Sequence, residues 1–74
     1  ELNIFNELKF YPNPAENTLY FHFKSPTLVR IFDLTGRVVF EATVENTMDI
    51  KSIKPGTYIL KTTDYLPGKF IKIR

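Results

Sequence analysis

Apolar and polar residues alternate along several short stretches of the chain, and no stretch keeps the helical period for three turns. The alternation is clearest over residues 18–23, where Leu19, Phe21 and Phe23 fall on one face. Because successive side chains of a strand point to opposite sides of a sheet, this pattern predicts a half-buried strand. His22 lies between two of the apolar positions and is expected to point outward.

Further strands follow the same logic, and turn-forming residues separate them at intervals of about 8–12 residues. They are predicted over residues 28–33, 38–44, 57–63 and 69–73, after a first short strand that ends at Phe10 and Tyr11. About seven short strands without helices favour an all-β fold, a small antiparallel immunoglobulin-like β-sandwich.

The last predicted strand sets Ile71 and Ile73 against Phe70 and Lys72. We expect the two isoleucines to point into the core and the other two residues to lie on the opposite face. Over the whole chain, the expected core includes Leu19, Phe21, Val29, Ile31, Tyr58, Leu60 and Ile71.

The stretch "YPNPAEN" at residues 11–17 places a proline on either side of an asparagine. Each proline fixes its own φ angle and pushes the preceding residue toward an extended conformation, so the stretch predicts a stiff corner. Asn13 is expected to hydrogen-bond to neighbouring backbone.

Other turns are predicted further along the chain. The stretch "DLTGR" at residues 33–37 predicts a hairpin in which Gly36 can adopt positive φ, and Pro-Gly pairs at 55–56 and 67–68 predict two further turns.

The chain has 74 residues, enough for one domain, and a domain of this size buries only roughly 60% of its unfolded surface. Cysteine is absent, so neither a disulfide nor a thiolate metal site can stabilise it. Stability must come from packing, for which seven phenylalanines and four tyrosines supply large apolar surfaces. The sequence contains neither a signal peptide nor an apolar run long enough to span a bilayer, and we interpret it as the C-terminal piece of a longer protein.

Charge is unevenly distributed, although the net charge is only +2. Residues 1–50 hold four basic and seven acidic side chains, whereas residues 51–74 hold six basic and one acidic. A basic C-terminal part can steer an acidic partner, or its lysines can simply keep an edge strand from aggregating. Without other information, the second explanation is favoured.

Few residues offer catalytic or ligand-binding chemistry. His22 is the single histidine, and carboxylates such as Asp33, Asp49 and Asp64 are scattered along the chain. Asp33 and Asp49 lie beside turns, where carboxylates usually accept backbone N–H groups. There is no glycine-rich phosphate loop and no calcium-loop signature, and the net charge is low for nucleic-acid binding. The sequence therefore predicts a protein that is not an enzyme and that holds no metal or cofactor.

Four segments, "YPNPAENTLYF", "VRIFDLTGRVVFEATV", "MDIKSIKPGTYILKT" and "GKFIKIR", follow one another between Lys9 and Arg74. Together they resemble the type A C-terminal sorting domain of the type IX (Por) secretion system of Bacteroidetes. Lys51 is a departure, because the family commonly has a serine there. The family motif matches Tyr11, Pro12, Asn13, Pro14, Asp33, Gly36, Arg37, Gly56 and Tyr58, and the family's closing basic strand matches Lys69, Phe70, Ile71, Lys72, Ile73 and Arg74.

The resemblance implies a secretion signal in which residues 1–8 link a preceding cargo protein to a sorting domain over residues 9–74. The domain would be recognised in the periplasm by shuttle proteins and delivered through an outer-membrane translocon to the cell surface or the medium. A sortase-like cysteine peptidase would then remove it. The six residues of the closing strand are the candidates for recognition, because an edge strand can be recognised through its backbone and its side chains.

Two other functions share the fold and the lack of catalysis. One is a passive immunoglobulin-like or fibronectin-like spacer in a secreted protein. The other is a carbohydrate-binding module that uses Tyr20, Phe32 or Tyr65 as a stacking platform. Either module would stay in the mature protein, whereas a sorting domain is removed from it.

Overall fold

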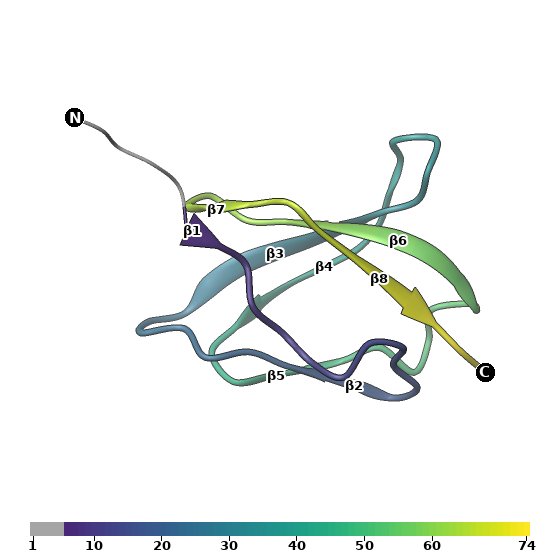
Figure 1. The fold of residues 1–74 in the computed structure, drawn as a ribbon, viewed down its shortest axis with the longest axis horizontal. Helices are drawn as coiled ribbons and strands as arrows, with labels where there is room; N and C mark the ends of the chain where they lie inside the picture. Colours follow the sequence, from purple (N-terminus) through teal and green to yellow (C-terminus); the bar gives the residue numbers. More distant parts are fainter. Residues whose placement is uncertain (1–5) are drawn as a thin grey trace.

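The computed structural model describes residues 6–74, so residues 1–5 of the predicted linker lie outside the described part. The described chain is all-β and contains no helix, which confirms the predicted fold class (Figure 1). Its strands are β1 (Asn6–Glu7), β2 (Thr18–Tyr20), β3 (Thr27–Phe32), β4 (Val38–Val44), β5 (Thr47–Asp49), β6 (Gly56–Lys61), β7 (Tyr65–Leu66) and β8 (Gly68–Lys72).

The strands form a small sandwich of two layers, as Figure 1 shows. One layer is an antiparallel four-stranded sheet in the order β4-β3-β6-β8, and the other is built around the antiparallel pair of β2 and β5. The strands β1 and β7 also pair, and this pair is parallel. The described part has eight strands, and Pro67 lies between β7 and β8.

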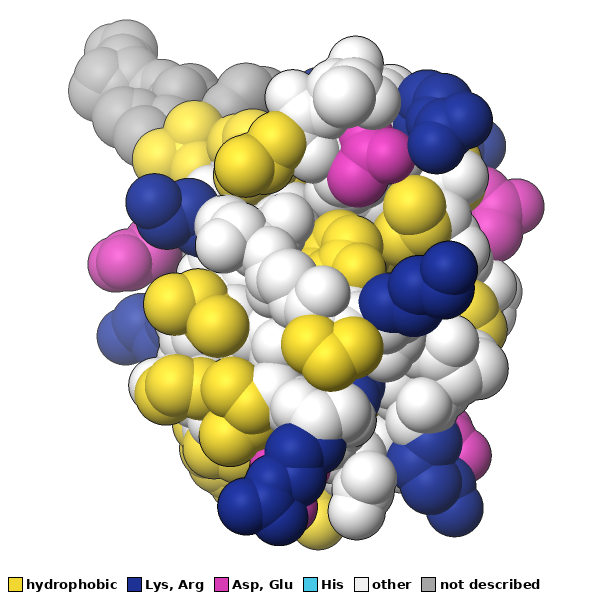
Figure 2. Space-filling model, turned by 90° about the vertical axis from the view of Figure 1, so that its right-hand side faces the viewer, with side chains coloured by type: hydrophobic (Ala, Val, Ile, Leu, Met, Phe, Trp, Pro, Cys, Tyr) yellow, Lys and Arg dark blue, Asp and Glu magenta, His cyan; other side chains and the backbone are white. Residues whose placement is uncertain are grey.

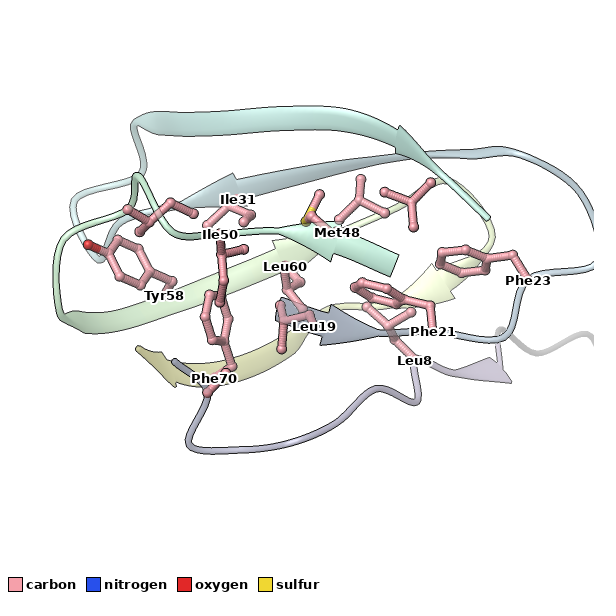
Figure 3. Close-up of a cluster of buried hydrophobic side chains, with 14 residues drawn as sticks. Leu8, Leu19, Phe21, Phe23, Ile31, Met48, Ile50, Tyr58, Leu60 and Phe70 are labelled. Atoms are coloured by element: carbon pink, nitrogen blue, oxygen red, sulfur yellow. The ribbon is translucent and has the colours of Figure 1, made fainter. Parts of the chain in front are cut away.

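The hydrophobic core fills the space between the layers, and Figure 3 shows side chains from both layers meeting there. Six of the seven core residues expected from the sequence are buried, namely Leu19, Phe21, Val29, Ile31, Tyr58 and Leu60. Burial of each such side chain stabilises the fold by about 1.5–3 kcal/mol. His22 is exposed between the buried Phe21 and Phe23, as its place in the alternation predicts.

The prediction of which side chains of the last strand point into the core is wrong, because the two faces of the strand are exchanged. Phe70 and Lys72 are buried, with relative exposures of 0% and 1%, whereas Ile71 and Ile73 are exposed by 42% and 38%. Phe70 contacts the rings of Tyr58 and Phe10, with ring centroids 5.6 Å and 6.4 Å away. An aromatic ring buries more apolar surface than an isoleucine, and the period of two then turns Lys72 inward with it.

The predicted turn at Pro67-Gly68 is also absent, because the chain continues through it from β7 into β8. Gly68 serves a different purpose, a close approach to Phe10. A Cβ atom at position 68 would lie 2.7 Å from Cε2 of Phe10. The glycine therefore leaves room for the Phe10 ring, which packs between Phe21 and Phe70.

The folded part begins before residue 9. The strand β1 pairs with β7, and Leu8 belongs to the buried core. That residues 1–8 connect the domain to a preceding cargo protein remains a prediction.

Candidate recognition site at the C-terminal strand

The strand β8 forms one edge of the four-stranded sheet, where it pairs with β6. Its alternation divides the six predicted recognition residues into two groups. Phe70 and Lys72 point into the molecule and do not present their side chains to a partner. The side chains exposed on this strand and directly after it are Lys69, Ile71, Ile73 and Arg74.

The outer edge of β8 is covered by residues 11–15, which we call the covering segment. Ala15 forms a parallel bridge with Lys72. The Ala15 amide donates to the Ile71 carbonyl (2.9 Å), and the Ile73 amide donates to the Ala15 carbonyl (2.8 Å). The predicted stiff corner is therefore also a short pairing partner of β8.

The side chain of Asn13 continues this pairing toward the start of β8. Its Nδ2 donates to the Lys69 carbonyl (3.1 Å), and its Oδ1 accepts from the Ile71 amide (2.9 Å). A side-chain amide thus stands where the peptide group of a neighbouring strand would stand. The expectation that Asn13 bonds to neighbouring backbone is wrong, since its partners lie 56 and 58 residues further along the chain.

On the side away from β8, the covering segment contacts the strand β2. Tyr11 and Tyr20 exchange backbone hydrogen bonds of 2.7 and 3.1 Å, and their rings meet edge to face at 5.4 Å. The peptide bonds before Pro12 and Pro14 are both cis. Through the bonds of Tyr11 to Tyr20 and of Asn13 to β8, the Tyr-Pro-Asn-Pro motif connects the layer of β2 to the edge of β8.

The last residues of the chain are tied to the same region. The buried Lys72 donates from Nζ to the main-chain oxygens of Arg74 (2.7 Å) and Ile73 (3.3 Å), which offsets part of the cost of burying its ammonium group. Nε of Arg74 lies 3.7 Å from Oε2 of Glu16, directly after the covering segment. Figure 2 faces this end of the molecule and shows basic side chains around exposed hydrophobic ones.

The motif residues of the β3–β4 hairpin have a structural role. Oδ1 of Asp33 accepts the amides of Thr35 (2.9 Å) and Arg37 (3.0 Å) and the Thr35 hydroxyl (2.6 Å), and Gly36 has a φ angle of 93°. The hydroxyl bond from Thr35, followed by the amide bond from Arg37, lowers the pKa of Asp33 from 3.8 to about 2. Asp33 is therefore a turn-capping carboxylate, as its position in the sequence predicts.

The remaining motif residues fix the entry into β6. The buried Tyr58 donates its hydroxyl to the Lys54 carbonyl (2.6 Å), which closes the bend that precedes the strand. Gly56, at the start of β6, has a φ angle of 156°, a backbone conformation that residues with a side chain rarely adopt. Of the residues matched to the family motif, those outside the covering segment thus act on the scaffold.

Other candidate groups do not assemble into a site. Tyr20 belongs to β2, whereas Phe32 lies in the other layer with Lys61 Nζ 4.8 Å above its ring, and Tyr65 packs against Phe23. These three rings therefore do not share one stacking platform. Within residues 6–74, no three histidine or acidic side chains gather to hold a metal ion. The described part also has no helix that is long and apolar enough to cross a membrane.

These features define a small β-sandwich whose closing strand is bonded along its outer edge to residues 11–15. The family model described as "Secretion system C-terminal sorting domain" matches residues 9–72, and the chain belongs to this family. It is therefore a C-terminal sorting signal for type IX secretion, a family role that is non-catalytic and that leads to the cell surface or the extracellular space.

Among solved structures, a thermostable endoglucanase from Alicyclobacillus acidocaldarius is similar with a TM-score of 0.64 and 19% identity. The match covers 77% of this chain but only 12% of that enzyme, and it supports the sandwich fold alone. No curated protein matches the chain.

Proposed function

We propose that the secretion machinery recognises this domain through the four exposed residues at the end of the chain: Lys69, Ile71, Ile73 and Arg74. The observation that carries the proposal is the alternation of β8, which turns Lys69 and Ile71 outward while Phe70 and Lys72 anchor the strand from inside. An anchored strand presents its outward side chains in a defined order, which is a requirement for specific recognition.

The chemistry of this surface favours an acidic partner with apolar positions. Two cations, Lys69 and Arg74, flank two isoleucines that are exposed by 42% and 38%. Residues 51–74 as a whole carry six basic side chains and one acidic side chain. Such a surface attracts an acidic groove over a distance and then buries apolar area on contact.

The partners in this proposal are the outer-membrane translocon and its shuttle proteins, which meet the folded domain in the periplasm. A sortase-like cysteine peptidase then removes the domain after the cargo, joined through residues 1–8, has reached the surface. The domain acts as an address and does no chemistry itself, since the thiol for that cleavage belongs to the peptidase.

Export of a periplasmic reporter tests this proposal. The domain is fused behind the reporter in a Bacteroidetes host, and Lys69 and Arg74 are both replaced by glutamine. Exposed charges contribute at most about 1 kcal/mol to folding, so the melting temperature should stay nearly constant. We expect the reporter to accumulate in the periplasm.

The matched control replaces two exposed lysines in another part of the same basic stretch, Lys51 and Lys54, by glutamine. This variant has the same net charge and should be exported like the parent. Normal export of the Lys69/Arg74 variant would contradict recognition through these cations. Retention of the unmodified fusion would contradict the role of the domain as a signal in that host.

A further inference from the structure

The outer edge of β8 carries main-chain groups that could pair with another strand. They are the Lys69 carbonyl, the amide and carbonyl of Ile71, and the Ile73 amide. All four are bonded to the covering segment, two by the Asn13 side chain and two by the Ala15 backbone. An incoming strand therefore cannot pair with β8 while the covering segment is in place.

The covering segment is held to β8 by four hydrogen bonds and by little apolar burial. Ala15 is its single buried residue, and its side chain is only a methyl group, whereas residues 11–14 are exposed. Little apolar area would be lost if these residues moved away from β8. Pro12 and Pro14 also lack an N–H group, so the segment is a poor template for adding a further strand.

We propose that the covering segment is a displaceable guard, and that the partner that displaces it is an extended acidic segment of the secretion machinery. That segment would add to β8 as a new edge strand and bond the four main-chain groups that Asn13 and Ala15 now occupy. The proposal rests on the proposed function, because it assumes that β8 is the recognised element, and it adds how the recognised edge becomes accessible.

The charge of β8 determines which kind of incoming strand it can pair with. A second copy of β8 could satisfy the same four groups, but pairing two copies around Ile71 would bring Lys69 and Arg74 of both chains onto one short interface. Like charges on adjacent strands are unfavourable, whereas acidic side chains would neutralise them. The guard thus prevents β8 from pairing with unsuitable strands until the acidic one arrives.

Hydrogen exchange of the isolated 74-residue chain tests whether the guard opens independently. The amides of Ile71 and Ile73 bond to the covering segment, whereas those of Phe70 and Lys72 face β6. We expect Ile71 and Ile73 to exchange at least tenfold faster than Phe70 and Lys72, because local opening exposes the first pair alone. Equal exchange of all four would mean that the segment leaves β8 only on global unfolding, and would overturn the proposal.

A reversible lock tests whether opening is needed for recognition. Ala15→Cys with Lys72→Cys places two cysteines at directly paired positions in a chain that has no others. The oxidised and reduced forms differ only in the lock, so the reduced form is the matched control. Binding to translocon purified in detergent from a Bacteroidetes host should be lost on oxidation and restored by reductant.

Equal binding of both forms would overturn the guard while leaving recognition of β8 intact. Failure of the parent chain to bind would contradict the proposed function itself.

If the parent binds but neither cysteine form does, a second variant tests whether the covering segment must open for binding. Asn13→Ala removes two bonds that hold the guard, which should raise the open fraction and tighten binding by about five- to thirtyfold. Weaker binding of Asn13→Ala, with Asn17→Ala unchanged, would overturn the proposal.

Discussion

At the scale of single residues, the last strand shows that a charged side chain can be buried when its neighbours on the same face belong to the core. Lys72 is buried because Phe70, two positions earlier, is the better core residue. The lysine stem packs inside while its Nζ reaches the main-chain oxygens of Ile73 and Arg74. A charged residue in a strand therefore does not by itself mark the outer face.

The facing of β8 gives the first prediction. Phe70→Ala should lower the free energy of unfolding by about 3–5 kcal/mol, because it leaves a cavity beside Tyr58 and Phe10. Ile71→Ala, at an exposed position of the same strand, should cost under about 1 kcal/mol. Urea unfolding measures both, and a larger loss for the isoleucine would contradict the observed facing.

The contact between Gly68 and Phe10 gives the second prediction. Gly68→Ala should destabilise the domain by about 1–3 kcal/mol, since the new methyl group overlaps the Phe10 ring. Phe10→Leu removes the ring and should make the same glycine substitution much less harmful. A double-mutant cycle measures this interaction, and purely additive effects would show that the overlap is not the cause.

At the scale of elements, the β3–β4 turn is stabilised by a capping group within it, whereas the edge of β8 is stabilised by a segment that is distant in the sequence. The β3–β4 hairpin depends on Asp33, whose bonds reach at most four residues along the chain. The edge of β8 depends on Asn13 from the opposite end of the sequence. Two motifs of similar length thus stabilise the fold over very different sequence distances.

The hairpin gives the third prediction. Because folding lowers the pKa of Asp33, its contribution to stability is present above the ordinary value of 3.8 and is lost as the pH falls toward 2. Asp33→Asn should therefore lose less stability over this range than the parent. Thermal melts at several acidic pH values compare the two, and Thr35→Ala, which removes the main cause, should behave similarly. Parallel profiles for parent and Asp33→Asn would contradict this role.

At the scale of the whole molecule, buried side chains hold the scaffold and the exposed cations near the C-terminus lie outside the core, although both occur in the same strands. The core and the turn motifs hold the fold, whereas the exposed cations at the end of the chain meet solvent. Asp33 and Tyr58, which match the family motif, act within the fold through bonds to the hairpin and to the Lys54 carbonyl.

Salt dependence gives the fourth prediction, which follows from this arrangement. The association rate of the domain with purified translocon should fall as ionic strength rises, because salt shortens the Debye length from about 30 Å at 0.01 M to about 8 Å at 0.15 M. Replacing Lys69 and Arg74 by glutamine should weaken this dependence. Surface plasmon resonance at several salt concentrations measures it, and a rate that salt leaves unchanged would contradict electrostatic steering.

Local sequence patterns were sufficient for the strands whose alternation is strongest. The facing of β2, β3 and β6, the capped hairpin at Asp33 and the all-β class follow from side-chain alternation and turn chemistry, which are local properties. The family motifs likewise lie in the sequence, and the match to the sorting domain does not depend on any tertiary contact.

The arrangement around β8 depends instead on contacts between segments that are distant in the sequence. The stretch from Lys69 to Ile73 offers two similar faces, and the ring partners of Phe70, which lie in other segments, selected between them. Asn13 could have bonded to any nearby backbone, and the sandwich brought it to Lys69 and Ile71 instead. The physical reason is that local periodicity carries no information about which distant segment will supply a contact.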